Sequence, residues 1–476
     1  MSAAVPAPLR DRAQRPALLG WLGVGLAIRL ALMPFGVTAD MLAVWWRSHR
    51  IAYDGEVFGE YLVNMGAHAV HAAWLRVVDP VLPDPDVVWS DPWFFDDFIA
   101  LAPQVVREFA AAEWAPQTLF ALKGLYLLAD LGAGVALLAL VGPMGARLTR
   151  RAWAFWMLSP IGLYATYAFG RYEMLAVALV VAAVLAAERR RVWLAALLLG
   201  LAVTMRGYPL LLVPLMALMV APRDHEPAGA HLVPRQLAWA GLAVVPFAAT
   251  MALNQALAGR VGEVARLSQS RTGGTLTAVS WPVDGDGQIY LFVLVLAVML
   301  GAVAGRQWGW WGAGRVPVGE AWVWLLLAHV ALFALSTWGA HYVAWLTPFV
   351  ALAIGRRPAW RGVLWLHLLQ VLLALAWFDA VGGPGTTTGT LLAAGPAAEQ
   401  LGSLRELLLT APGTAAQVQG VLRTGFVAAS ALLAAPAVVE LWRGWRAVSP
   451  DGGGDALGGS VSGPAASDAA ARRQSR

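Results

Sequence analysis

Long runs of apolar residues, separated by short polar breaks, follow one another along almost the whole chain. A helix that crosses the membrane needs about 20 mostly apolar residues, and this measure predicts about twelve spans. In the stretch 152–221 very short polar breaks separate four runs, which leaves re-entrant or broken helices as an alternative there. The predicted spans are 17–37, 116–141, 152–169, 172–187, 192–206, 208–221, 236–257, 288–305, 320–337, 342–355, 362–381 and 421–442.

The composition indicates that lipid covers much of the folded chain. Of its 476 residues, 59% are hydrophobic and 13% are charged, whereas a soluble domain carries about 25% charged residues. A water-soluble fold of this length could not cover its surface with so few charges. The sequence therefore predicts an all-α polytopic bundle of transmembrane helices.

Arginines in every second polar break predict the orientation of the bundle, because short cytoplasmic loops are enriched in Lys and Arg. With residues 1–16 in the cytoplasm, one alternation fits the whole chain and places both termini inside. The run after Pro16 is too long for the core of a signal peptide, so it is interpreted as the first span. The arginines of the predicted cytoplasmic side include Arg10, Arg12, Arg15, Arg147, Arg150, Arg151, Arg189–Arg191, Arg223, Arg235, Arg306, Arg315, Arg356, Arg357, Arg361 and Arg443.

The remaining loops then lie outside the cytoplasm, at 38–115, 258–287 and 382–420. The first holds 12 of the 29 acidic residues together with many Trp and Phe residues. Aromatic residues mixed with charges are typical of amphipathic helices at the membrane surface. We thus predict one transmembrane domain over 17–447, with amphipathic helices in its first outer loop, and a disordered cytoplasmic tail over 448–476 that is rich in Gly, Ser, Ala and Asp.

Several classes of protein are excluded by what the sequence lacks. There is no cysteine, so disulfides, thiolate metal sites and a cysteine nucleophile are absent. Neither a P-loop nor the motifs of zinc proteases and serine hydrolases occur, and no basic stripe on a soluble face indicates a nucleic-acid partner. The aspartate pairs Asp84 with Asp86 and Asp96 with Asp97 could recruit a divalent cation, but solvated loop charges are the better interpretation.

Asp40 follows the first span directly, at the predicted outer interface. A carboxylate in that position can act as a general base on a sugar hydroxyl. The alternative is an N-cap of the amphipathic helix that begins at Met41.

Lys123 and Asp130 lie seven residues apart in one apolar segment and so face the same side of a helix. Ionisable groups within a span usually face a cavity or a partner. Lys123, the single lysine of the chain, is therefore a candidate phosphate ligand, with Asp130 holding the helix packing. The alternative is a lysine that extends to the membrane surface and an aspartate bound to a neighbouring helix. Arg29, within the first span, requires an acidic partner that the sequence does not identify.

Two further arginines, Arg171 and Arg206, stand at the predicted outer ends of neighbouring segments, beside Tyr172 and Glu173. The guanidinium group binds phosphate oxygens in a bidentate manner, which makes both arginines candidate phosphate ligands. An ion pair of either arginine with Glu173, holding helix ends, is the alternative.

His341 and Tyr342 occupy a predicted outer hairpin between two spans. Both side chains can donate hydrogen bonds to a phosphate or a sugar. A histidine in such a place is also often only an interfacial residue.

These features together resemble the GT-C glycosyltransferases, and most of all the mannosyltransferases that use polyprenol-phosphate mannose. An aspartate after span one, with a long amphipathic loop behind it, is similar to the start of that pattern. Glu173 departs from it, since an Asp is commoner there, and Ala340 with His341 replaces a Pro-Gln-like pair. The further stretches that carry the resemblance are Leu122–Leu131, Leu158–Pro160 with Phe169–Glu173, Leu199–Pro214 and His341–Phe349.

The resemblance implies an inverting sugar transfer at the outer face of a bacterial plasma membrane. Asp40 would deprotonate the acceptor hydroxyl of a lipid, glycan or protein, with polyprenyl phosphate as leaving group from the donor sugar, mannose. It implies further that the donor phosphate is held by cations of the protein, and that neither a metal nor another cofactor is required. The residues implied at the phosphate are Lys123, Arg171, Arg206, His341 and Tyr342, with Asp130, Tyr172 and Glu173 as supporting residues.

Two other functions fit the same chain. A transporter or flippase of a lipid-linked glycan would use the same basic outer cavity, but transporters often show internal repeats, and the two halves of this sequence show none. The third interpretation is a structural subunit without activity. The ionisable residues within the spans argue only weakly against it.

The alternation of basic loops makes the topology testable. Reporter fusions placed after Arg191 and after Arg361 are expected to read as cytoplasmic, and a fusion inside 258–287 as external. Paired alkaline phosphatase and green fluorescent protein fusions measure this. An external reading after Arg191 would overturn the predicted orientation.

Overall fold

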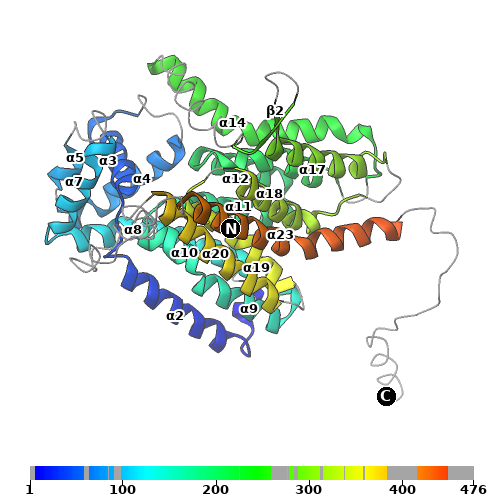
Figure 1. The fold of residues 1–476 in the computed structure, drawn as a ribbon, viewed down its shortest axis with the longest axis horizontal. Coiled ribbons are helices and arrows are strands. Elements are labelled where there is room, and N and C mark those ends of the chain that lie inside the picture. Colours follow the sequence, from blue (N-terminus) through cyan, green and yellow to red (C-terminus); the bar gives the residue numbers. More distant parts are fainter. Residues whose placement is uncertain are drawn as a thin grey trace, which may run out of the picture.

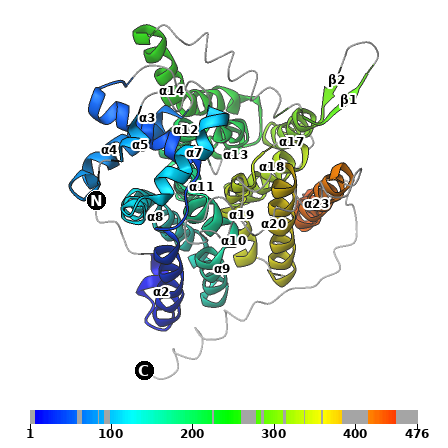
Figure 2. The same cartoon turned by 60° about the vertical axis from the view of Figure 1, so that its left-hand side comes forward.

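The computed structural model describes residues 6–57, 64–83, 85–90, 98–223, 226–258, 276, 278–283, 288–310, 315–336, 338–356, 360–382 and 415–448. Within these residues the chain is a helical bundle (Figures 1 and 2). The sheet in this part of the chain is one antiparallel pair, β1 (Ser280–Pro282) and β2 (Gln288–Tyr290), with Trp281 opposite Ile289. The all-α class predicted from the sequence is confirmed.

The helices follow one another with short connections. Those of the first half are α1 (Ala7–Arg10), α2 (Arg15–Leu32), α3 (Ala39–His49), the π-helix η1 (Arg50–Asp54), α4 (Met65–Val78), η2 (Asp79–Val81), α5 (Asp86–Trp89), α7 (Phe98–Ala111), α8 (Ala115–Val141), η3 (Gly142–Met144), α9 (Ala146–Leu158), α10 (Pro160–Leu163), the π-helix η4 (Tyr164–Ala168), α11 (Glu173–Glu188) and α12 (Val192–Met205). Those of the second half are η5 (Tyr208–Leu212), α13 (Val213–Val220), η6 (Ala230–Leu232), α14 (Val233–Ala258), α17 (Leu291–Gln307), η8 (Val318–Glu320), α18 (Ala321–Leu335), η9 (Ala340–Leu346), α19 (Thr347–Arg356), α20 (Trp360–Gly382) and α23 (Ala415–Val448).

Six helical stretches among the described residues are long and apolar enough to cross a membrane: Arg15–Leu32, Ala115–Met144, Ala230–Leu257, Val318–Leu335, Arg361–Val381 and Ala416–Trp442. The protein is thus a multi-pass membrane protein. Each of the twelve predicted spans overlaps helical structure, but several of these helices are too short to span alone. The count of about twelve stays a prediction.

The helices of the stretch 152–221 are broken, which agrees with the alternative of broken helices given for this stretch. Helix α9 ends at Leu158, and the Ser159 hydroxyl then accepts a hydrogen bond from the Gly162 amide and caps α10. The π-helix η4 follows, and further on the 3₁₀ segment η5 separates α12 from α13. These irregular turns free backbone carbonyls inside the bundle, and such carbonyls need partners.

The first predicted outer loop folds into helices. Figure 1 shows α3, α4, α5 and α7 gathered at one end of the bundle, next to α8. Two of its tryptophans, Trp45 and Trp46, are buried inside the protein and do not lie on its surface. Asp84, Asp91, Asp96 and Asp97 lie outside the described residues, as do most of 258–287 and 382–420 and the tail after Val448.

Arg29 joins three helices, and its unidentified partner is Asp130. The Arg29 Nε lies 2.7 Å from an Asp130 carboxylate oxygen, with both side chains buried. Arg29 also donates to the carbonyls of Met157 and Trp156, at 2.7 and 3.3 Å, which the break after Leu158 leaves without helical partners. The Tyr167 hydroxyl donates to the same carboxylate at 2.9 Å. The pair therefore holds α2, α8 and the broken end of α9 together.

Asp130→Ala is expected to destabilise the protein strongly, since removing one partner of a buried ion pair costs about 3–5 kcal/mol. The double variant Arg29→Met with Asp130→Leu should recover most of that loss, because it leaves no unpaired charge. Thermal unfolding in detergent measures both. Equal stability of Asp130→Ala and the parent protein would show that the Arg29–Asp130 pair does not stabilise the packing of these helices.

Candidate active site

The chain after α2 packs directly against the turn that follows η4. A Cβ atom on Gly36 would lie 2.2 Å from the Ala168 carbonyl oxygen, so only glycine permits this approach. Next to it, the Thr38 hydroxyl donates to the Phe169 carbonyl at 3.0 Å. Two segments more than 100 residues apart in sequence thus lie in contact at the start of α3.

Thr38, and not Asp40, is the N-cap of α3. Its side chain accepts a hydrogen bond from the Met41 amide at 3.2 Å, and the helix begins at Ala39. The expectation that Asp40 caps a helix beginning at Met41 is wrong, because Thr38 occupies that position. Asp40 sits in the first turn with its carboxylate free of a capping role.

Lys123 stabilises the contact between the chain after α2 and the end of η4. Its side chain is completely buried, and its ammonium donates to the carbonyl of Gly36 and, at 2.7 Å, to that of Tyr167. Lys123 therefore does not extend to the membrane surface. Its predicted contact with a phosphate stays a prediction, since two of its three protons are directed at these carbonyls.

Gly170 turns the chain so that Arg171 faces Asp40. Gly170 has φ +75°, and a Cβ there would lie 2.5 Å from the Met41 sulfur. The Arg171 Nη1 lies 3.2 Å from an Asp40 carboxylate oxygen. Arg171 is 8% exposed whereas Asp40 is 46% exposed, so the carboxylate is the accessible partner of this ion pair.

Glu173, the first residue of α11, is fully buried and binds Arg206. The Arg206 Nε donates to both carboxylate oxygens, at 2.9 and 3.1 Å, and its Nη2 donates to one of them. The Trp345 indole donates to the second oxygen at 2.5 Å. The alternative of an Arg206–Glu173 ion pair is thus present in the structure, and Trp345 is a member that sequence reasoning missed.

Aromatic rings surround the two arginines. The guanidinium of Arg206 lies 4.6 Å from the ring centre of Tyr172 and 5.1 Å from that of Tyr342. Arg171 lies 5.3 Å from the Tyr172 ring. Such cation–π contacts stabilise a cation that has left water, so Tyr172 and Tyr342 help to keep both charges buried.

His341 is buried and stacks on Phe169, with ring centres 4.4 Å apart. Neither of its ring nitrogens has a hydrogen-bond partner among the described residues. The Nε of Arg171 likewise lacks one, although it lies 3.8 Å from Glu173. Buried polar groups are normally hydrogen-bonded, so the site contains donors that a ligand could satisfy.

Helix α4 adds a histidine that sequence reasoning did not select. His71 is buried, 3.0 Å from the Tyr126 hydroxyl through Nε2, and its ring meets Tyr172 edge-on at 5.5 Å. Burial lowers the pKa of His71 to about 4, so its imidazole is neutral at physiological pH. Its position three residues after His68 in a loop helix was the only signal in the sequence.

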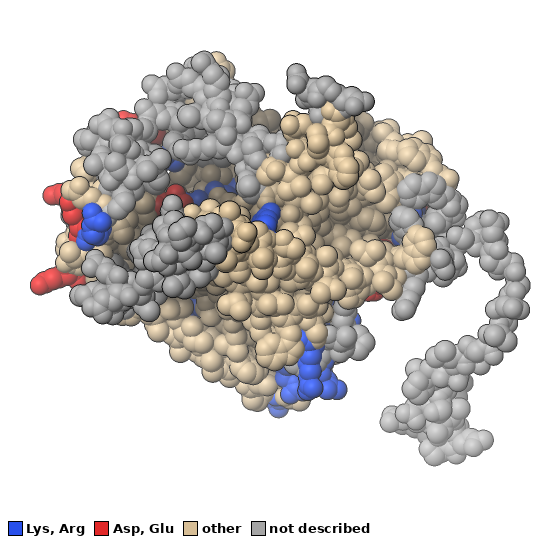
Figure 3. All heavy atoms as spheres, in the orientation of Figure 1, with Lys and Arg blue, Asp and Glu red and all other residues tan. Residues whose placement is uncertain are grey.

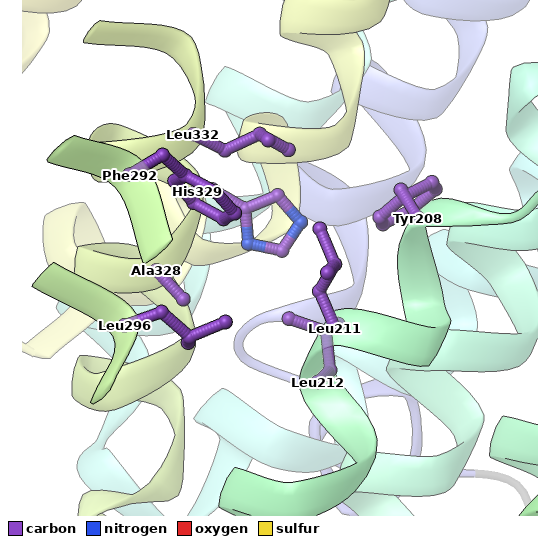
Figure 4. Close-up of a pocket in the computed structure, with 8 residues that line it drawn as sticks. All are labelled: Tyr208, Leu211, Leu212, Phe292, Leu296, Ala328, His329 and Leu332. Carbon is purple, nitrogen blue, oxygen red and sulfur yellow. The ribbon is translucent and has the colours of Figure 1, made fainter. Parts of the chain in front are cut away.

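Figure 3 shows acidic and basic side chains together inside a hollow between the α3–α7 helices and the rest of the bundle. A small cavity of about 10 Å³ lies beside Tyr208, and Figure 4 shows the His329 imidazole directed into it. Since about one water molecule fits such a volume, this cavity is too small for a sugar or a lipid. Within the described residues no three His, Asp or Glu side chains cluster as a metal site would require.

The model of Glycosyltransferase family 87 matches residues 109–321 of the chain, a little less than half of it. The match indicates a membrane glycosyltransferase of the GT-C-like kind. It covers Lys123, Arg171 and Arg206, whereas Asp40 and His341 lie outside it. No curated protein matches the chain.

Gly170→Ala is expected to lower sugar transfer and to cost about 1–2 kcal/mol of stability, because a residue with a Cβ is strained in the left-handed region. Gly207→Ala is the matched control, since it also adjoins a site arginine but has no atom within 4 Å of a new Cβ. Thermal unfolding and a transfer assay measure both effects. Equal behaviour of the two variants would contradict the role given to the Gly170 turn.

Proposed function

We propose that the protein is an inverting glycosyltransferase that takes a sugar, mannose, from a polyprenyl-phosphate donor. The acceptor is a hydroxyl of a lipid-linked, glycan or protein molecule at the extracytoplasmic face of the plasma membrane. The family match supports a glycosyltransferase, and the resemblance to polyprenol-phosphate-mannose enzymes supports the donor.

The observation that carries this proposal is the pair of buried donors with unfilled hydrogen bonds, Arg171 and His341. A buried guanidinium without an acceptor at its Nε is costly unless a ligand supplies one. A phosphate brings several strong acceptor oxygens and a negative charge. Arg171 can bind it through the guanidinium edge that faces Asp40, with His341 at its side and Tyr342 against the His341 ring at 4.1 Å.

Asp40 is the general base of the proposed reaction. It takes the proton of the acceptor hydroxyl, and the acceptor oxygen attacks C1 of the donor sugar from the face opposite the phosphate. The bond between C1 and the phosphate oxygen breaks, and its electron pair leaves with the polyprenyl phosphate. Arg171 then stabilises the charge that develops on the leaving group, which is the main electrostatic task of such a transfer.

The ion pair between Arg171 and Asp40 links donor binding to the base. A donor phosphate competes with the Asp40 carboxylate for the same guanidinium. Asp40 is about half exposed while Arg171 is not, so the carboxylate can turn toward an acceptor when the phosphate replaces it.

Arg206, Glu173 and Lys123 position this pair in the proposal. Arg206 is occupied by the buried Glu173 carboxylate, and it adds positive potential close to the phosphate. Lys123 fixes the backbone on both sides of the pair. Asp130 does not contact this pair; it binds Arg29 and Tyr167 and so supports the helices that carry the pair.

Asp40→Asn keeps the size of the side chain but removes its basicity. We expect transfer from a polyprenyl-phosphate sugar to fall about 10²- to 10⁴-fold, the usual loss when a general base is removed. A purified variant, assayed with polyprenyl-phosphate mannose after its folding is checked, measures this.

Asp54→Asn is the matched control, because Asp54 lies in the same loop, is 44% exposed and pairs with Arg50 at 3.4 Å. It should retain the parent activity. If Asp40→Asn stays within a few-fold of the parent protein, the base lies elsewhere, and Asp54, Glu56 and Glu173 are the next carboxylates to test.

A further inference from the structure

A larger cavity, of about 610 Å³, lies along the side of α9, and no residue of the candidate active site lines it. It extends from Arg147 in the first turn of α9 to Pro160 just beyond its end. At 1.5 Å per residue this is a groove on the order of 20 Å long. The predicted topology puts Arg147 on the cytoplasmic side and Arg171 on the outer side, so the groove begins at the membrane surface opposite to the candidate active site.

The walls of the groove come from α2, α9, α19 and α20, with Pro160 of α10 at one end. Trp21 of α2 and Leu364 and Leu368 of α20 face α9 across it, with Ile354 of α19 nearby. Figure 2 shows α9 between α2 and α20. Most of α2 is not buried by the rest of the protein, so the groove lies beside a helix that faces lipid.

One end of the groove is basic and the rest is apolar. Arg147, Arg150 and Arg151 line it at the start of α9, and Phe155 and Leu158 line it further along. Basic side chains gather on the surface in this region in Figure 3. Arg147 and Arg150 are exposed, and neither forms an ion pair within the described part of the chain.

Helix stability does not explain this placement. A cation in the first turn of a helix opposes the helix dipole, so Arg147 makes α9 slightly less stable. The membrane orientation of the chain accounts for basic residues in this loop, but it does not require them to line a groove with apolar walls.

We infer that this groove binds an anionic phospholipid of the cytoplasmic leaflet. Its phosphate lies between Arg147, Arg150 and Arg151, and one acyl chain follows α9 toward Pro160. The charge of the three guanidinium groups matches a lipid phosphate, since juxtamembrane arginines attract anionic lipids. The volume falls within the roughly 300–1,000 Å³ of ligand sites, and the apolar length requires a lipid chain in addition to a phosphate.

Lipid retention by the full-length protein tests this inference. Purified protein is titrated in detergent with phosphatidylglycerol, phosphatidylcholine, polyprenyl phosphate or inorganic phosphate, and the bound molecules are counted by native mass spectrometry. We expect retained phosphatidylglycerol, little phosphatidylcholine and no competition by inorganic phosphate. Equal retention of the two phospholipids, or retention of polyprenyl phosphate alone, would overturn the inference.

Charge-matched variants separate the groove from the general surface charge. Arg147→Gln with Arg150→Gln should weaken phosphatidylglycerol retention about tenfold or more. Arg189→Gln with Arg191→Gln removes the same charge from exposed positions outside the groove lining and should change retention little. Equal losses in both double variants would show binding by surface charge alone, which contradicts the inference.

A variant that keeps the arginines tests the acyl chain. Ala154→Trp fills the middle of the groove and should displace phosphatidylglycerol while sugar transfer continues. Retention equal to the parent protein would place the lipid outside the groove. The wild-type titration stands by itself if a variant fails to fold.

Discussion

The buried ammonium of Lys123 joins the backbone after α2 to the backbone at the end of η4. Both carbonyls stand where regular helix ends, so neither has a helical partner. One cation donates a hydrogen bond directly to both. Because Asp40 lies four residues beyond the first carbonyl and Arg171 four residues beyond the second, the geometry of their ion pair depends on this contact. Gly36 and Gly170 allow the two segments to come this close.

Around this contact the charges balance almost completely. Asp40 pairs with Arg171, and Glu173 pairs with Arg206 and lies 3.8 Å from the Arg171 Nε. The two pairs differ in depth, since Glu173 is fully buried whereas Asp40 is about half exposed. A buried pair with good geometry keeps its partners in place, whereas a partly exposed pair can exchange its partner for a ligand. In the proposed reaction the buried Arg206–Glu173 pair holds the site in place, and the partly exposed Arg171–Asp40 pair takes part in the chemistry.

The sequence predicted the helical membrane class and the twelve helical regions, because hydrophobic period and loop charge depend on local sequence alone. It placed Arg171, Arg206 and Glu173 together because they stand at the ends of neighbouring segments. It marked Asp130 as a carboxylate within a span that could bind a neighbouring helix, but it could not identify Arg29 as the partner, because the two residues are 101 positions apart and their pairing depends on tertiary packing. Trp345 was missed for a related reason, because an indole that binds a carboxylate looks in the sequence like any core tryptophan. The alternative that Asp40 is an N-cap was wrong because the helix begins two residues earlier, at Ala39, and Thr38 caps it by accepting a hydrogen bond from the Met41 amide.

The complete burial of Lys123 has a chemical consequence for the whole molecule. It is the single lysine of a chain that also has no cysteine, so the folded protein offers amine reagents only its α-amino group and offers thiol reagents nothing. Lysine acylation or carbamylation of the folded state is thereby avoided. Introduced cysteines would be the only thiols of the protein, so a pair of them, one in α2 and one in α20, could carry spin labels or fluorophores that report the distance between these helices. Conversely, a lysine that becomes reactive would signal that the joint between α2 and η4 has opened.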